Sequence, residues 1–131
     1  MDAMFEHPVT VRWRDTDALG HVNHAVFLTY LEEGRDAFFA QILGGEPDYV
    51  VVRIEVDLRA EVRYPERRVT VQLGLERLGT TSLTTREKIL TPAQEVAAEA
   101  RVVTVRWDRR ARTPVPFSDA ERARLTAALA S

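Results

Sequence analysis

The hydrophobic positions of the chain alternate with polar positions in five stretches, which predicts five β-strands. In the first stretch, "FEHPVTVRWR" (5–14), Val9, Val11 and Trp13 fall on one side. The same period recurs in "RIEVDLRAEVR" (53–63), "VTVQLGLERL" (69–78), "SLTTREKIL" (82–90) and "EVAAEARVVTVRWD" (95–108). Short turns join the last four stretches, so we expect these strands to pair in an antiparallel sheet.

A helical period lies between the first strand and the other four. In residues 24–43 the apolar side chains of Phe27 and Leu31 begin a stripe that continues along one helix face. Asn23 is a favourable N-cap residue just before this segment, and Gly44 is a favourable residue just after it. We therefore expect one long helix from about His24 to Leu43.

A second, shorter helix is predicted at the C-terminal end. Ser118 and Glu121 have the spacing of a capping box, which places the start of this helix at about Asp119. The order of strand, long helix, four strands and short helix predicts the α+β class, with the long helix covering one face of the sheet. The length of 131 residues fits one domain over residues 1–131.

Composition and charge exclude several classes of protein and site. The sequence contains no cysteine, which excludes disulfides, thiolate nucleophiles and cysteine-rich zinc sites. A net charge of -2 gives no electrostatic reason to expect nucleic acid as a partner. We expect no membrane span, because no stretch approaches the roughly 20 apolar residues that one needs. The first ten residues do not read as a signal peptide, so we expect a cytoplasmic protein.

The connection between the first strand and the long helix concentrates the titratable chemistry. The segment "RDTDALGHVNHAVF" (14–27) holds two aspartates, two histidines, an asparagine and a glycine. A helix N-terminus offers backbone N–H groups and a partial positive charge, so residues 23–26 would stabilise a developing oxyanion. Asp17 precedes these donors and could act as a nucleophile or as a general base on water. Gly20 lets the backbone bend sharply and a ligand approach closely.

The same residues permit plainer interpretations. Asp15 and Asp17 could cap turns, and Asn23 could be a structural cap in either case. His21 could be a solvent-exposed loop residue, whereas we expect His24 to point inward from the first helical turn. Asp17, His21 and His24 also form a two-histidine, one-carboxylate set that could hold a metal. Because no further acidic–histidine cluster is there to support such ligands, we assign no metal.

A weaker candidate lies on the predicted strand 82–90. Arg86 and Lys88 alternate there on the same side as Ser82 and Thr84. Two cations and two hydroxyls could hold the phosphates of a nucleotide-like cofactor. The alternative is an ordinary solvated strand face.

The segment "RDTDALGHVNHAVFLTYLEEGR" (14–35) resembles the signature of hotdog-fold acyl-CoA thioesterases of the 4-hydroxybenzoyl-CoA thioesterase type. That signature is an aspartate, two or three residues, a glycine, and then an asparagine or histidine that leads into a long helix. The order of elements extends the resemblance over residues 5–109. It implies a hotdog fold, in which a five-stranded antiparallel sheet wraps around one long central helix. It also implies homodimers, often paired into tetramers, with active sites at the dimer interface.

The resemblance also assigns roles to residues of this sequence. Asp17 matches the catalytic carboxylate of the family. His24 falls where many relatives keep an assisting histidine, and where the first backbone N–H groups of the helix hold the thioester oxygen. The loop and oxyanion positions are Gly20, Val22, Asn23 and Ala25.

The substrate that the resemblance implies is an acyl-CoA, hydrolysed to a free acid and coenzyme A. Coenzyme A is then part of the substrate, and no separate cofactor is expected. Arg86 and Lys88 lie on the strand where relatives often bind the phosphates of coenzyme A. Phe27 departs from the family, because relatives commonly have a tyrosine there. For the acyl group we expect an apolar cleft, and its lining candidates are Trp13, Phe27, Tyr30 and Leu31.

Two other functions fit the same fold. One is a non-catalytic hotdog domain that binds acyl thioesters or serves as an assembly partner. The other is a different reaction on an acyl thioester, such as hydration of an enoyl group. The sequence leaves open the acyl chain, the carrier (coenzyme A or acyl carrier protein) and the choice between dimer and tetramer.

Overall fold

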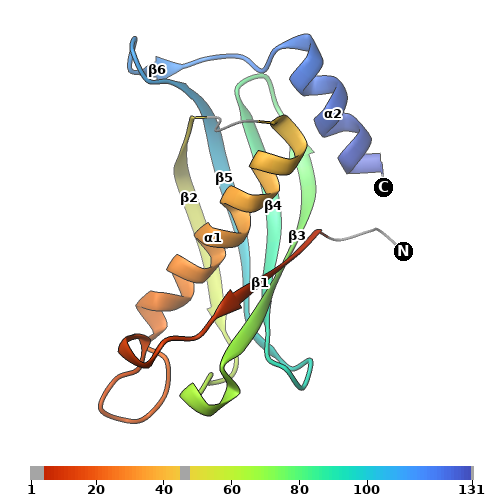
Figure 1. Ribbon diagram of the computed structural model, residues 1–131. Coiled ribbons are helices and arrows are strands. Elements are labelled where there is room, and N and C mark those ends of the chain that lie inside the picture. Colours follow the sequence, from red (N-terminus) through yellow and green to blue (C-terminus); the bar gives the residue numbers. More distant parts are fainter. Residues whose placement is uncertain (1–4, 45–47, 131) are drawn as a thin grey trace.

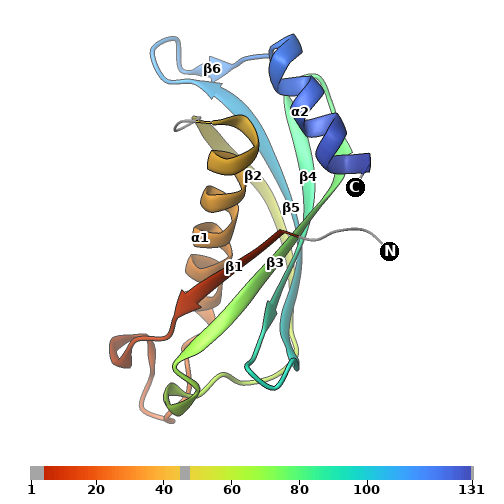
Figure 2. The ribbon, with the colours of Figure 1, turned by 45° about the vertical axis from the view of Figure 1, so that its right-hand side comes forward.

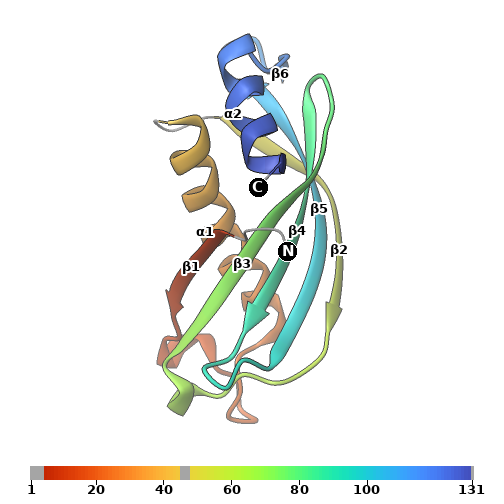
Figure 3. The same ribbon diagram turned by 90° about the vertical axis from the view of Figure 1, so that its right-hand side faces the viewer.

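An antiparallel sheet curls around one long helix in the computed structural model, which describes residues 5–44 and 48–130 (Figures 1 and 3). The helices are α1 (His24–Leu43) and α2 (Asp119–Ala130). The strands are β1 (Phe5–Thr10), β2 (Tyr49–Leu58), β3 (Arg68–Leu78), β4 (Ser82–Leu90), β5 (Val96–Asp108) and β6 (Thr113–Pro114).

The five long strands lie in the order β1-β3-β4-β5-β2, and every neighbouring pair is antiparallel. The two-residue strand β6 pairs with β5 and was not predicted. Helix α1 crosses the concave face of the sheet and contacts β1, β3 and β4 (Figure 2). The predicted α+β class and hotdog arrangement are therefore confirmed.

Helix α1 has the predicted bounds because local signals determine both of its ends. The Asn23 side chain accepts a hydrogen bond from the Ala25 N–H, and Gly44 follows the last turn with φ +77°. In the middle of the helix Gly34 faces β3 so closely that a Cβ there would lie 2.5 Å from Cγ1 of Val71. The apolar stripe of the helix is thereby pressed directly against the sheet.

A buried ion pair joins α1 to β4 within the core. Nε and Nη2 of Arg35 donate to the two carboxylate oxygens of Glu87, each over 2.9 Å. The Thr85 hydroxyl donates to the same carboxylate over 2.6 Å. Both charged side chains are almost completely excluded from solvent. The bidentate geometry and the third donor compensate for that exclusion.

Helix α2 begins where the capping box predicts. The Glu121 N–H donates to the Ser118 hydroxyl, and the Ser118 N–H donates to the Glu121 carboxylate. Leu125 buries its side chain completely, and α2 contacts β3 and α1 at the upper end of the sheet (Figure 2). Within the described parts of the chain, no helix is long and apolar enough to cross a membrane.

Two predicted strands differ from the observed ones by more than one residue at an end. Strand β2 covers 49–58 instead of 53–63, because its regular pairing with β5 ends at Leu58 and Ala98. Beyond that pair the N–H groups of Arg59 and Ala60 both donate to the Ala97 carbonyl, which ends the ladder. Strand β1 ends at Thr10, because a short 3₁₀ helix (Trp13–Asp15) follows it. Trp13 therefore does not continue the inward side of β1, and 75% of its surface is exposed.

Candidate active site

The connection between β1 and α1 folds back on itself as a small hairpin. At its base the Asn23 N–H donates to the Asp15 carbonyl, and Thr16 forms a bridge with Val22. Further out, the Asp17 N–H donates to the His21 carbonyl over 2.9 Å. Gly20, with φ +85°, completes the turn that brings residues 17 and 21 side by side.

Asp17 and His21 form a pair at the tip of this hairpin. Oδ2 of Asp17 lies 3.4 Å from Nδ1 of His21, and Oδ1 of Asp17 accepts the Leu19 N–H over 2.9 Å. The two side chains are 28% and 30% exposed, respectively. The carboxylate of Asp17 therefore has a defined orientation and remains accessible to a ligand. His21 is thus a partly exposed loop residue whose imidazole faces the Asp17 carboxylate.

The start of α1 offers fewer free backbone N–H donors than we expected from residues 23–26. The Asn23 N–H is bound to Asp15, the Ala25 N–H to the Asn23 side chain, and the Val26 N–H to the Asn23 carbonyl. The His24 N–H meets no acceptor within residues 5–44 and 48–130. One backbone donor is thus left at the helix N-terminus for an oxyanion.

The side chain of His24 is exposed, not directed inward as we expected. The buried positions of the helix begin only at Phe27, so His24 in the first turn precedes the part of α1 that packs in the core. His24 and Leu28, one turn apart, thus present a common exposed face of α1.

Beneath the hairpin, Asp15 is the centre of a buried network. Only 3% of Asp15 is exposed, and its carboxylate accepts the Tyr30 hydroxyl over 2.7 Å. Arg12 donates to the same carboxylate from its backbone N–H and from its guanidinium. Burial raises the pKa of Asp15, but the bonds from Tyr30 and Arg12 outweigh burial and hold that pKa below its usual range. Burial and the Asp15 carboxylate raise the pKa of Tyr30, so its phenol stays protonated and donates.

Comparison with known proteins identifies the family of this chain. The sequence matches the thioesterase-like superfamily over residues 11–125. The chain belongs to that superfamily. The match includes the whole hairpin and α1, so the superfamily pattern covers the Asp17 site together with its scaffold.

Solved structures that are similar to this chain over nearly its full length include a thioesterase and a predicted thioesterase. A thioesterase from Thermus thermophilus, complexed with coenzyme A and Zn, is 34% identical and has a TM-score of 0.83; the match covers 96% of this chain and 94% of that one. A predicted thioesterase from Bacillus stearothermophilus is 32% identical and has a TM-score of 0.85, with 97% of each chain covered. A comparison with curated protein sequences gave no match.

The apolar residues predicted to line an acyl cleft do not form one group. Phe27, Tyr30 and Leu31 are buried in the core of the chain, whereas Trp13 is exposed. Val22 is also buried, and its N–H donates to the Val62 carbonyl. Their contact with a substrate stays a prediction.

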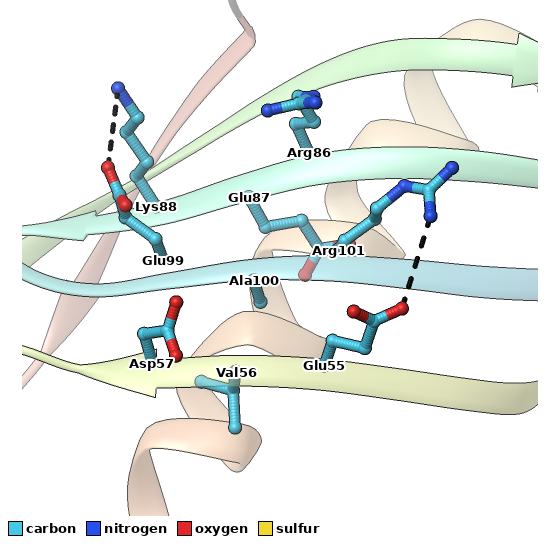
Figure 4. A pocket seen from close by; sticks show the side chains of 9 residues that line it. All are labelled: Glu55, Val56, Asp57, Arg86, Glu87, Lys88, Glu99, Ala100 and Arg101. Atoms are coloured by element: carbon cyan, nitrogen blue, oxygen red, sulfur yellow. Dashed lines mark ion pairs between the residues drawn. The ribbon is translucent and has the colours of Figure 1, made fainter.

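Arg86 and Lys88 lie on the sheet face opposite to α1, as Figure 4 shows. They line a shallow hollow of about 600 Å³ together with acidic side chains. Arg86 pairs with Glu76, and Lys88 lies 3.9 Å from Glu99. The sheet separates these cations from α1, and each already faces a carboxylate.

Sequence reasoning missed two features of the site. The bond between Asp15 and Tyr30 joins residues 15 positions apart, and no local pattern connects them. The other is that, of the four N–H groups expected at residues 23–26, His24 alone has one without an acceptor in the described chain, because the Asn23 cap binds those of Ala25 and Val26. The second feature was detectable, because a capped helix start leaves its first N–H without an intrahelical acceptor.

Proposed function

We propose that this protein hydrolyses acyl-CoA thioesters to a carboxylic acid and coenzyme A. The observation that carries the proposal is the position of Asp17. Its carboxylate is oriented by Leu19 and His21, in a hairpin that leads directly to the unused His24 N–H. Membership of the thioesterase-like superfamily supports the reaction class, and the coenzyme A complex of the Thermus thermophilus relative supports the carrier.

In the proposed reaction the His24 N–H donates to the thioester carbonyl oxygen and stabilises the negative charge that develops there. Asp17 then attacks the carbonyl carbon, the C–S bond breaks, and coenzyme A leaves as a thiolate. Water hydrolyses the resulting mixed anhydride and restores the carboxylate. In the alternative route Asp17 takes a proton from water, which adds to the carbonyl, and the proton passes to the leaving sulfur. The exposed His24 imidazole assists in either route.

The proposal includes a homodimer formed at the outer edge of β2. No strand among the described residues pairs with that edge. The edge also exposes apolar side chains, since Val52 is 58% exposed and Ile54 is 39% exposed. The segment that follows β2 contacts the catalytic hairpin, because His21 forms a bridge with Arg63. A second chain at this edge would therefore lie alongside the hairpin and complete the cleft.

The test is release of free thiol from a panel of short, branched, aromatic and medium-chain acyl-CoA thioesters. We expect wild-type protein to release coenzyme A from at least one of them. Asp17→Asn should lower that rate by at least the roughly 10²- to 10³-fold that the loss of one oxyanion donor costs. Asp119→Asn, at an exposed position of α2, is the matched control and should keep the wild-type rate.

Three results would contradict the proposal. An Asp17→Asn variant that keeps most of its activity would remove Asp17 from the reaction. Loss of enoyl absorbance without free thiol would indicate hydration, and binding without any turnover would indicate an acyl-thioester binding domain.

A further inference from the structure

Asp15 connects three separate segments at the base of the catalytic hairpin. Its carboxylate binds Arg12 at the end of the β1 segment and Tyr30 in the second turn of α1. Its backbone carbonyl accepts the N–H of Asn23, the N-cap residue of α1. The side chain and the main chain of one residue thus fix the hairpin to both of its neighbours.

Both oxygens of the Asp15 carboxylate are occupied by donors. Oδ1 accepts the Arg12 guanidinium over 3.1 Å and 3.2 Å, and Oδ2 accepts the Arg12 backbone N–H over 2.9 Å and the Tyr30 hydroxyl over 2.7 Å. An amide in this place would turn its NH₂ group toward one of these donors. The network therefore requires a carboxylate and not merely a polar side chain.

The hairpin transmits the position of Asp15 to the reacting groups. Asp17 follows Asp15 by two residues and is held in register by the bridge between Thr16 and Val22. His24 follows Asn23 directly. The hydrogen bond between the Asn23 N–H and the Asp15 carbonyl joins the two ends of the hairpin. It therefore sets the separation between the Asp17 carboxylate and the His24 N–H.

We propose that Asp15, held by Tyr30 and Arg12, is a positioning residue that keeps Asp17 in line with the N-terminus of α1. This inference rests on the proposed hydrolysis. It assigns Tyr30 a task different from lining an acyl cleft, since its hydroxyl is buried against Asp15. Catalysis of this kind depends on angstrom-scale placement of the reacting groups. A hairpin whose two ends are held less firmly should therefore slow the chemical step more than it weakens substrate binding.

The deciding variant is Tyr30→Phe, which removes one hydroxyl and keeps the ring in the core. The chain offers a matched control in Tyr49→Phe, since the Tyr49 hydroxyl donates to Asp36 in the second half of α1, far from the hairpin. Both variants lose one tyrosine–aspartate hydrogen bond. We expect Tyr30→Phe to lower kcat about tenfold with KM within twofold of wild type, while Tyr49→Phe keeps both constants.

A second measurement needs no substrate. Hydrogen exchange followed by mass spectrometry should show faster exchange in the segment 16–23 of Tyr30→Phe than in wild type, and unchanged exchange in Tyr49→Phe. Arg12→Ala, at an exposed side chain, should act in the same direction as Tyr30→Phe if the latter folds poorly.

The possible failures are distinguishable. An active wild type whose Tyr30→Phe and Tyr49→Phe variants have equal kcat and equal exchange would overturn the positioning role and leave the hydrolysis intact. A wild type that releases no thiol from any acyl-CoA would overturn the hydrolysis and, with it, any catalytic task for Asp15.

Discussion

In the proposed reaction His24 acts through both its backbone N–H and its side chain, and substitutions can separate the two roles. The residue occupies the first position of α1, directly after the N-cap residue Asn23. Proline is well tolerated at this position, because the first N–H of a helix has no intrahelical acceptor. The extended backbone of Asn23, with φ -62° and ψ 135°, also suits a residue before proline.

We therefore predict different losses for two substitutions of His24. His24→Ala removes the imidazole and keeps the N–H, and should lower kcat about 10- to 100-fold, the range of general acid–base assistance. His24→Pro removes the N–H as well, and should lose a further 10²- to 10³-fold or so if that donor holds the oxyanion. Circular dichroism of both variants controls for folding. Equal kcat values for the two variants would show that the backbone donor has no part in the reaction.

The residues of the hairpin were only partly predictable. Asp17, Gly20 and the Asn23 cap follow from short-range patterns, since each acts on backbone within a few positions. The exposure of His24 depends on where the packing of α1 in the core begins, and the Asp15–Tyr30 bond depends on how helix and hairpin meet. These are tertiary facts, and no pattern of a single sequence contains them.

At the scale of elements, the close approach of α1 to the sheet depends on Gly34. A Cβ at this position would lie 2.5 Å from Cγ1 and 2.8 Å from Cβ of Val71, and the short branched side chain of Val71 cannot move aside by rotation alone.

We expect Gly34→Ala to destabilise the protein by about 1–3 kcal/mol, the usual cost of overpacking a core. The clash acts against the gain of about 1 kcal/mol in helix propensity. Urea unfolding measures the difference, and Thr29→Ala, at an exposed position of the same helix, is the control that changes propensity without a clash. A Gly34→Ala protein as stable as wild type would mean that helix and sheet are less tightly packed than described.

The contrast between α1 and β2 explains which elements the sequence predicts well. The bounds of α1 are set by its own caps, Asn23 and Gly44, and match the prediction. The bounds of β2 are set by its pairing with β5, which lies about 40 residues further along the chain. Hydrophobic alternation identified β2 as a strand but continued past Leu58, where pairing ends.

At the scale of the whole molecule, we propose that the protein assembles through the open edge of β2. We predict that the protein is a dimer or a larger homo-oligomer in solution, and that Ile54→Lys weakens self-association at least about tenfold, because it brings two like charges together at a strand edge. Size-exclusion chromatography with light scattering measures the shift.

The control for this prediction is Ala120→Lys, which adds the same charge at an exposed position of α2. The rate of thiol release should fall together with the fraction of dimer in Ile54→Lys, and both should stay unchanged in Ala120→Lys. A monomeric wild type, or an Ile54→Lys variant that assembles normally, would rule out assembly through β2.

The buried pair of Arg35 and Glu87 limits how this fold can be redesigned. Removal of either partner strands the other charge in the core, at a cost of about 3–5 kcal/mol, whereas joint exchange for well-packed apolar residues is often neutral or favourable. A library that varies one codon at a time would reject every alternative at both positions. Only simultaneous randomisation of the two codons would reach sequences with apolar residues at both positions. Invariance of the two positions in a single-codon library would therefore reflect the instability of every single-substitution intermediate, and not a requirement for charge.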